Sequence, residues 1–228
     1  MSVFRPMTVN CPACGTPIEV NVSLSVNADR RPDLRAAIIN GTFQTVPCPK
    51  CGQAIRIDPE MTFVDVGRGQ WIAAFPAAKI AQWRELEEQS RAAFDLAFGS
   101  RAPAAAREMG ASMKPRIVFG WSAMREKLVA VDHQLDDVIL ELIKLAIVRT
   151  SASSPLSRET ELRFLGIEGD KLSMAWIRGQ TDAVVEWLKA PRQLYDDVLG
   201  NEEGWRALRE ELSAGLFVDA NRLLVLAA

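Results

Sequence analysis

The sequence of 228 residues predicts an α+β protein in which a small, strand-rich N-terminal lobe precedes a larger lobe of helices and strands. Alternating apolar and polar residues, as in 18–22 and 53–58, are typical of half-buried strands. Apolar residues at three- and four-residue steps, clearest from about Gln134 to Arg149, are typical of amphipathic helices. All four cysteines precede residue 52, and this sets the first lobe apart.

The cysteines form two matched motifs, CPACG at 11–15 and CPKCG at 48–52. Two thiolates with two residues between them can grip one metal ion if the chain turns tightly, and the proline and glycine of each motif suit such a turn. Two such knuckles facing each other give a closed tetrahedron of sulfurs that leaves no position for a substrate. We therefore expect one structural zinc ion per chain, with four ligands: Cys11, Cys14, Cys48 and Cys51.

Other uses of cysteine pairs remain open at this point. Iron in a rubredoxin-like site uses similar knuckles, although the aromatic residues that usually shield such a centre are sparse around these loops. A thiol-based redox switch is the other alternative, but a thioredoxin-like dithiol needs only one pair at a helix N-terminus. Lys50 and Arg56 are close enough in sequence to offset the two surplus negative charges of a four-thiolate zinc site.

Residues 1–76 are expected to form the zinc-ribbon-like domain. A short helix should begin at Pro32 and end at Asn40-Gly41, where glycine permits left-handed backbone. Strands are predicted around the ranges 18–22, 53–58, 61–65 and 71–75.

A helical connector is expected over 77–114, and a domain of helices packed on an antiparallel sheet over 115–228. The connector should contain one long amphipathic helix that ends near Gly99 and one weak helix after it. The C-terminal domain should contain a strand at 116–119, helices at 121–131 and 134–149, a polar loop at 150–158, a hairpin around 162–176, a strand at 183–188, helices at 191–199 and 202–212, and a last strand or pair at 215–226.

The two CPxC motifs, together with PDLR at 32–35 and Asn40-Gly41, resemble the bacterial CpXC protein family. The resemblance covers residues 8 to 76 well and continues more loosely through 125–127 and 136–137. It implies a zinc-binding domain of uncharacterised function, and it supplies no catalytic residue.

Composition limits the partners. A net charge of -2 and a pI of about 5.6 give no clustered basic excess for nucleic acid or an anionic membrane. Neither a signal peptide nor a membrane span is expected, so we expect the chain in the cytoplasm, where thiols stay reduced. Arg30, Arg31 and Arg35 could make a small basic patch, but Asp29 and Asp33 interrupt it.

Several residues are candidates for further roles. His133, Asp137 and Glu141 follow at four-residue steps and could form a second site, although a solvated helix face is the simpler interpretation. Trp176 and Trp187 are expected in the core, while Trp83 would mark a protein-binding surface or homodimer seam if it were exposed.

The sequence contains no phosphate-binding loop, nucleophile elbow or zinc-protease motif, and we expect no pocket with convergent polar groups in 115–228. The predicted function is that of a structural-zinc protein acting as a non-catalytic interaction or adaptor module. Its partner is expected to be a protein or a second copy of the chain. The alternatives are a nucleic-acid-binding regulator, which is less favoured, and a thiol-based redox sensor.

Overall fold

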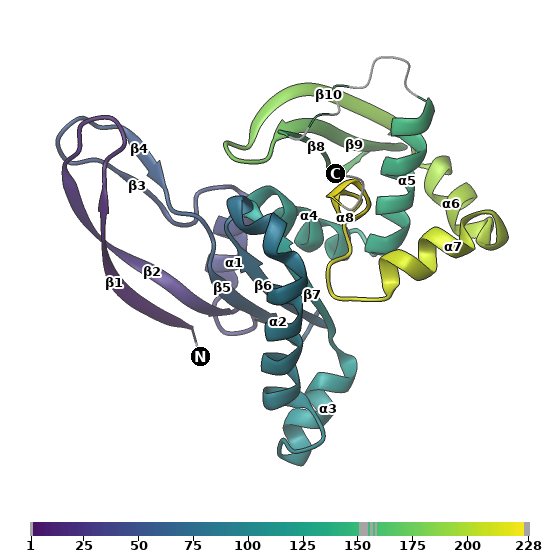
Figure 1. The fold of residues 1–228 in the computed structure, drawn as a ribbon, viewed down its shortest axis with the longest axis horizontal. Helices are drawn as coiled ribbons and strands as arrows, with labels where there is room; N and C mark the ends of the chain where they lie inside the picture. The colour runs from purple at the N-terminus through teal and green to yellow at the C-terminus, as the bar shows by residue number, and fades with distance from the viewer. Residues whose placement is uncertain (1, 151–154, 156, 158, 226–228) are drawn as a thin grey trace.

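The computed structural model describes residues 2–150, 155, 157 and 159–225 (Figure 1). Its largest sheet has five strands in the order β1-β2-β5-β6-β7. These strands are β1 (Val3–Asn10), β2 (Pro17–Asn27), β5 (Met61–Asp65), β6 (Gln70–Phe75) and β7 (Lys114–Phe119). The β1–β2 and β5–β6 pairs are antiparallel, whereas β2 pairs with β5, and β6 with β7, in parallel.

The β1–β2 pair extends far beyond the rest of this sheet as an arm, with a second small sheet beside its outer half (Figure 1). That sheet is the antiparallel pair β3 (Thr45–Pro47) and β4 (Ala54–Arg56). The sequence analysis did not anticipate β1, whose side chains are almost all exposed and therefore show no alternation of burial.

Helices cover both faces of the five-stranded sheet. Successive side chains of β6 point to opposite faces and therefore pack in two different cores. Ile72 and Ala74 pack on one side, with α1 (Pro32–Ile39) and α4 (Gly120–Asp132). Trp71 and Ala73 pack on the other side, with α2 (Trp83–Phe98). The crossover from β6 to β7 runs through the 3-10 turn η1 (Ala77–Gln82), α2 and α3 (Ala104–Ser112).

The C-terminal lobe is built on an antiparallel sheet in the order β10-β9-β8, formed by β8 (Thr160–Glu168), β9 (Lys171–Arg178) and β10 (Ala183–Pro191). Its core lies between this sheet and α5, where Leu142, Phe164 and Met174 are completely buried. The remaining helices are α5 (Asp137–Thr150), α6 (Gln193–Gly200), α7 (Glu202–Ser213) and α8 (Asn221–Val225).

These elements confirm the α+β class, and most predicted helices and strands lie within a few residues of their observed positions. The last strand, predicted at 215–226, is wrong: the described part of this segment is an irregular stretch followed by α8. The Asp219 carboxylate accepts a hydrogen bond from the N–H of Asn221 at 2.8 Å and so favours a helix start over a strand. Leu226, and most of the loop predicted at 150–158, lie outside the described residues.

The domain boundaries at 76 and 114 remain predictions. The sheet itself continues across them, because β7 pairs with β6 in six consecutive positions from Gln70↔Lys114 to Phe75↔Phe119. No helix among the described residues is both long enough and apolar enough to cross a membrane.

Candidate metal centre

The two cysteine motifs fold into the same turn. In the first, the N–H of Gly15 donates to the carbonyl of Cys11 at 2.8 Å, and in the second the N–H of Gly52 donates to that of Cys48 at 2.9 Å. Gly15 and Gly52 have φ of 70° and 72°. A Cβ at either glycine would meet open space, so the requirement for glycine is the positive backbone angle and not close packing.

The four sulfur atoms come together at the outer end of the arm, all within 4.8 Å of one another. The Sγ atoms of Cys11 and Cys51 are 3.7 Å apart, as are those of Cys14 and Cys48. A tetrahedron with metal–sulfur bonds of about 2.3 Å has sulfur–sulfur edges of about 3.8 Å. A disulfide would need about 2.05 Å, and all four cysteines are free. The arrangement therefore fits a single metal ion with four sulfur ligands.

The thiols perturb one another strongly. The side chain and N–H of Thr16 hydrogen-bond to Cys14 and lower the pKa of its thiol to about 6. The N–H of Gln53 acts in the same direction on Cys51, but burial and the three neighbouring thiols raise the pKa of Cys51 to about 12. Four thiolates at this spacing repel one another unless a cation lies among them. The chemistry of the donor set therefore fits a divalent, thiophilic ion.

The surroundings of the cluster are apolar and small. Beside the cysteines, the local core consists of Ile55 with the half-buried Ile18 and Val46. Arg56, which the sequence analysis placed as a partner for the thiolates, instead forms an ion pair with Asp182 and lies over the ring of Trp121 at 5.7 Å.

The candidate second site does not form. His133 caps the end of α4 and packs edge-on against Phe164, whereas Asp137 and Glu141 lie on α5. The four cysteines are the group that could hold a metal ion in the described part of the chain. The simpler interpretation of a solvated face is also wrong, because Asp137 and Glu141 belong to a buried network of charges.

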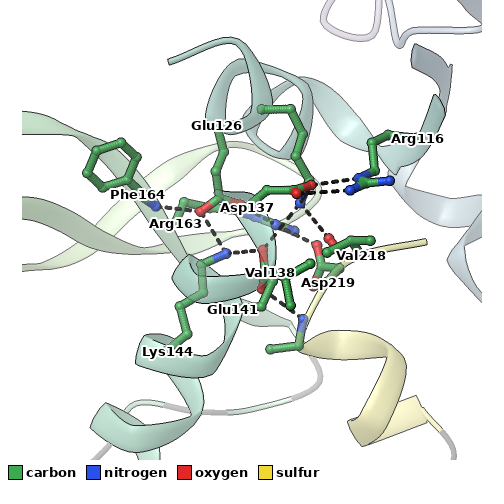
Figure 2. A network of polar contacts seen from close by, with 12 residues as sticks. Arg116, Glu126, Asp137, Val138, Glu141, Lys144, Arg163, Phe164, Val218 and Asp219 are labelled. Carbon is green, nitrogen blue, oxygen red and sulfur yellow. Dashed lines mark hydrogen bonds and ion pairs between the residues drawn. The ribbon is translucent and has the colours of Figure 1, made fainter. Parts of the chain in front are cut away.

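That network was missed by the sequence analysis. Arg163, with 1% of its side chain exposed, binds three carboxylates: Glu126 at 2.9 Å, Glu161 at 2.5 Å and Asp219 at 2.6 Å. Lys144 joins Glu126, at 2.6 Å, to Glu141, at 2.9 Å. Figure 2 shows Glu126, Glu141, Lys144, Arg163 and Asp219 converging from α4, α5, β8 and the segment before α8.

Lys127 and Arg116 extend the network through Asp137. The ammonium of Lys127 lies 3.0 Å from this carboxylate and donates to the carbonyl of Val218 at 2.5 Å, while Arg116 holds Asp137 with two nitrogens at 2.7 and 3.1 Å. Burial opposes ionisation, but Lys127 and Arg116 hold the pKa of Asp137 far below its usual range. Burial also raises the pKa of Glu141, where Lys144 acts against it. The network thus ties the C-terminal segment to α4 and α5.

A signal for this network was present in the sequence. Glu126 and Lys127 lie in α4, where ten residues are buried and no continuous polar face exists. Arg163 lies between two core residues of β8, Leu162 and Phe164. Charged residues in such positions must find charged partners, since an unpaired buried charge is too costly.

The structure also tests the remaining candidate residues. Trp176 is buried as expected, but Trp187 has 65% of its surface exposed, which corrects its assignment to the core. Trp83 is buried beside Phe217, so it marks no surface. Arg35 is buried and pairs with Asp65 and Asp132, and the basic patch therefore loses its third member.

A small pocket does occur, contrary to expectation. It is lined partly by charged residues of the predicted C-terminal domain, among them Arg116, Lys127, Asp136 and Asp137.

Fold and site together define an α+β protein with two CPxCG knuckles whose four cysteines could hold a metal ion. The family model described as CpXC protein matches residues 9–144, and the chain belongs to the CpXC family. The matched region contains all four cysteines and extends through α4 into α5. No curated protein and no solved structure matches the chain.

Proposed function

We propose that this protein is a non-catalytic adaptor, in which one structural zinc ion stabilises the arm and an exposed apolar strand binds another protein. The observation that carries the zinc assignment is the closed set of four sulfurs at tetrahedral spacing. Such a site has no open position for water or substrate, so a metal there organises structure. Zinc suits four thiolates in a reducing compartment such as the cytoplasm, and no aromatic ring belongs to the described apolar cluster around the cysteines to shield an iron centre.

Metal content tests this part of the proposal directly. Elemental analysis of purified protein should give one zinc ion per chain. Cys48→Ser and Cys51→Ser should both abolish the bound zinc, whereas Glu19→Gln, which changes an exposed carboxylate of β2, should retain it. Iron in place of zinc, or full zinc content in the cysteine variants, would contradict the assignment.

The interaction surface is proposed on β10, an edge strand of the C-terminal sheet. Val184, Val185 and Trp187 are 44%, 47% and 65% exposed, and we call these three residues the β10 patch. A tryptophan with most of its surface in water is costly unless a partner covers it, and tryptophan is enriched at protein interfaces. Lys189 and a bulge between Val184 and Glu186 disfavour non-specific pairing of β10 with strands of other proteins. A specific partner is therefore favoured.

A photo-crosslinking amino acid at Val185 tests the surface in the native cell. We expect an adduct of one defined mass that disappears when Trp187 is changed to Ser. The matched control is the same crosslinker at Leu96 on α2, which is 78% exposed without belonging to the patch. Light scattering on the purified protein then shows whether the partner is a second copy. Equal crosslinking at the two positions, or none at Val185, would refute the β10 patch.

A further inference from the structure

The pocket of about 180 Å³ lies where the parallel strands β6 and β7 begin, against the end of α4 and the turn before α5. Ile72, Val131 and Leu135 supply its apolar wall. Its volume is about six times a water molecule's share of the liquid, and it is smaller than the pockets of about 300 Å³ or more that hold drug-sized ligands. A ligand of this pocket must therefore be a small metabolite.

Gln70 provides a fixed, unpartnered acceptor in the lining. The residue is only 5% exposed, and its Nε2 donates to the backbone carbonyl of Lys127 at 3.0 Å, which fixes the orientation of the amide. Its Oε1 is buried and has no hydrogen-bond partner within the described chain. A buried acceptor in this state is destabilising unless it meets a donor. The ligand should therefore present an N–H or O–H group to Oε1.

The rim of the pocket is cationic. Gln70 and Lys114 are partners in the β6–β7 register, so their side chains leave the sheet on the same face. The Lys114 side chain is 69% exposed and its ammonium lies 3.4 Å from Asp136, a long contact that leaves donors free. Arg68, also at the rim and 49% exposed, makes contacts of 3.2 and 3.3 Å with Asp65 and Asp132.

The inner cations differ from those at the rim. Arg116 holds Asp137 through the contacts drawn in Figure 2, and Lys127 lies 3.0 Å from the same carboxylate, so both cations are committed to the protein. Anion binding is therefore left to Lys114 and Arg68.

We infer that this pocket binds a small 2-hydroxy or 2-amino carboxylate with an apolar side chain. The carboxylate lies against Lys114 and Arg68, the neighbouring hydroxyl or amino group donates to Oε1 of Gln70, and the side chain packs against Ile72 and Leu135. This site is separate from the metal centre and from the β10 patch, and it stands or falls independently of the adaptor proposal.

Four probes that share the same branched apolar side chain test the ligand class on the full chain. L-leucine and 2-hydroxy-4-methylpentanoate carry both polar groups, 4-methylpentanoate lacks the donor, and isopentylamine lacks the carboxylate. Titrations followed by calorimetry and amide chemical shifts should show binding of at least one complete probe. Each truncated probe should bind about tenfold more weakly or worse, because 4-methylpentanoate leaves the Gln70 acceptor without a donor and isopentylamine loses the charge-assisted hydrogen bonds to Lys114 and Arg68.

Variants locate the site. Lys114→Met, at an exposed position, should weaken binding of the complete probe about tenfold, and Gln70→Leu should remove the preference for the donor group. Lys189→Met is the matched control, because Lys189 is a similarly exposed lysine paired with one carboxylate, and it should change nothing. Three results would overturn the inference. These are no binding of either complete probe at millimolar concentration, binding of inorganic phosphate as tight as that of the complete probes, and unchanged binding of the complete probe by Lys114→Met.

Discussion

Replacement of Arg163 by methionine tests the buried charge network most directly. The guanidinium lies within hydrogen-bond distance of Glu126, Glu161 and Asp219, and only 1% of its side chain is exposed. Methionine keeps most of the volume, so the main change is the loss of the positive charge. Removing one partner of a buried ion pair costs about 3–5 kcal/mol, because the remaining charge stays buried without compensation.

This loss is large relative to the whole stability of a domain, which is about 5–15 kcal/mol. Urea unfolding followed by tryptophan fluorescence should therefore show a fall of about 3–5 kcal/mol in the free energy of unfolding at neutral pH. Combining Arg163→Met with Asp219→Asn should restore part of the lost free energy of unfolding, because the double variant buries one fewer uncompensated charge.

Lys189→Met is the control for this experiment too. Lys189 pairs with Glu168 at 2.6 Å, but both side chains are more than half exposed, at 52% and 57%. Exposed pairs contribute only about 0–1 kcal/mol. If Arg163→Met is no more destabilising than Lys189→Met, the network does not hold the C-terminal lobe together and the reasoning fails.

Three further predictions follow from the same structure. Trp176→Ala should lower the free energy of unfolding by about 3–5 kcal/mol in urea titrations, whereas Trp187→Ala should change it by about 0.5 kcal/mol or less, because only Trp176 is buried; equal losses would contradict the burial of one and the exposure of the other. Arg163 lowers the pKa of Asp219 to about 2 against the opposing effect of burial, so this carboxylate stabilises the fold above its ordinary pKa of 3.8 and the contribution is lost as pH falls through about 2; acid titrations should show Asp219→Asn to be less acid-sensitive than the unchanged protein. A zinc chelator should raise amide hydrogen exchange in 9–20 and 45–56 while leaving α5 protected; a uniform increase would refute a local role for the metal.

Local patterns predicted local structure well. The helix at Pro32 ends where Asn40-Gly41 predicted, with Gly41 at φ 74°, because a proline start and a glycine stop act through the backbone of a few neighbouring residues. The cysteine cluster was predictable for the same reason. Each CPxCG motif encodes its own turn, and a shared metal then requires the two turns to meet.

The sequence placed some charged residues of the network among apolar ones, but it could not predict which distant partners they meet. In the sequence, Glu141 and Lys144 look like part of a polar face of α5. That face is interior because Lys127, Arg163 and the segment around Asp219 pack against it. Sequence periodicity records which residues share a side of a helix, but not whether solvent or protein covers that side.

The tryptophans illustrate the same limit on a strand. Trp176 and Trp187 both lie in alternating segments of the antiparallel C-terminal sheet, yet Trp176 is in the central strand and Trp187 in the edge strand. Alternation of apolar and polar residues shows which side chains share a face of a strand. That face is buried only when another element packs on it. What packs on each strand decides the outcome: β8 is also an edge strand, yet its Leu162 and Phe164 are buried.

The two charged centres stabilise the protein in different ways because they lie in cores of different size. The cluster at the cysteines adds only Ile55, Ile18 and Val46, and burial of three aliphatic side chains at about 1.5–3 kcal/mol each cannot offset the cost of about 1–2 kcal/mol per residue for ordering the knuckles. On the proposed function, we therefore expect the two knuckles to depend on a bound metal ion. The network around Arg163 lies beside a large apolar core. Its charges hold the C-terminal segment against this core, because Asp219 pairs with Arg163 at 2.6 Å and the carbonyl of Val218 accepts a hydrogen bond from Lys127.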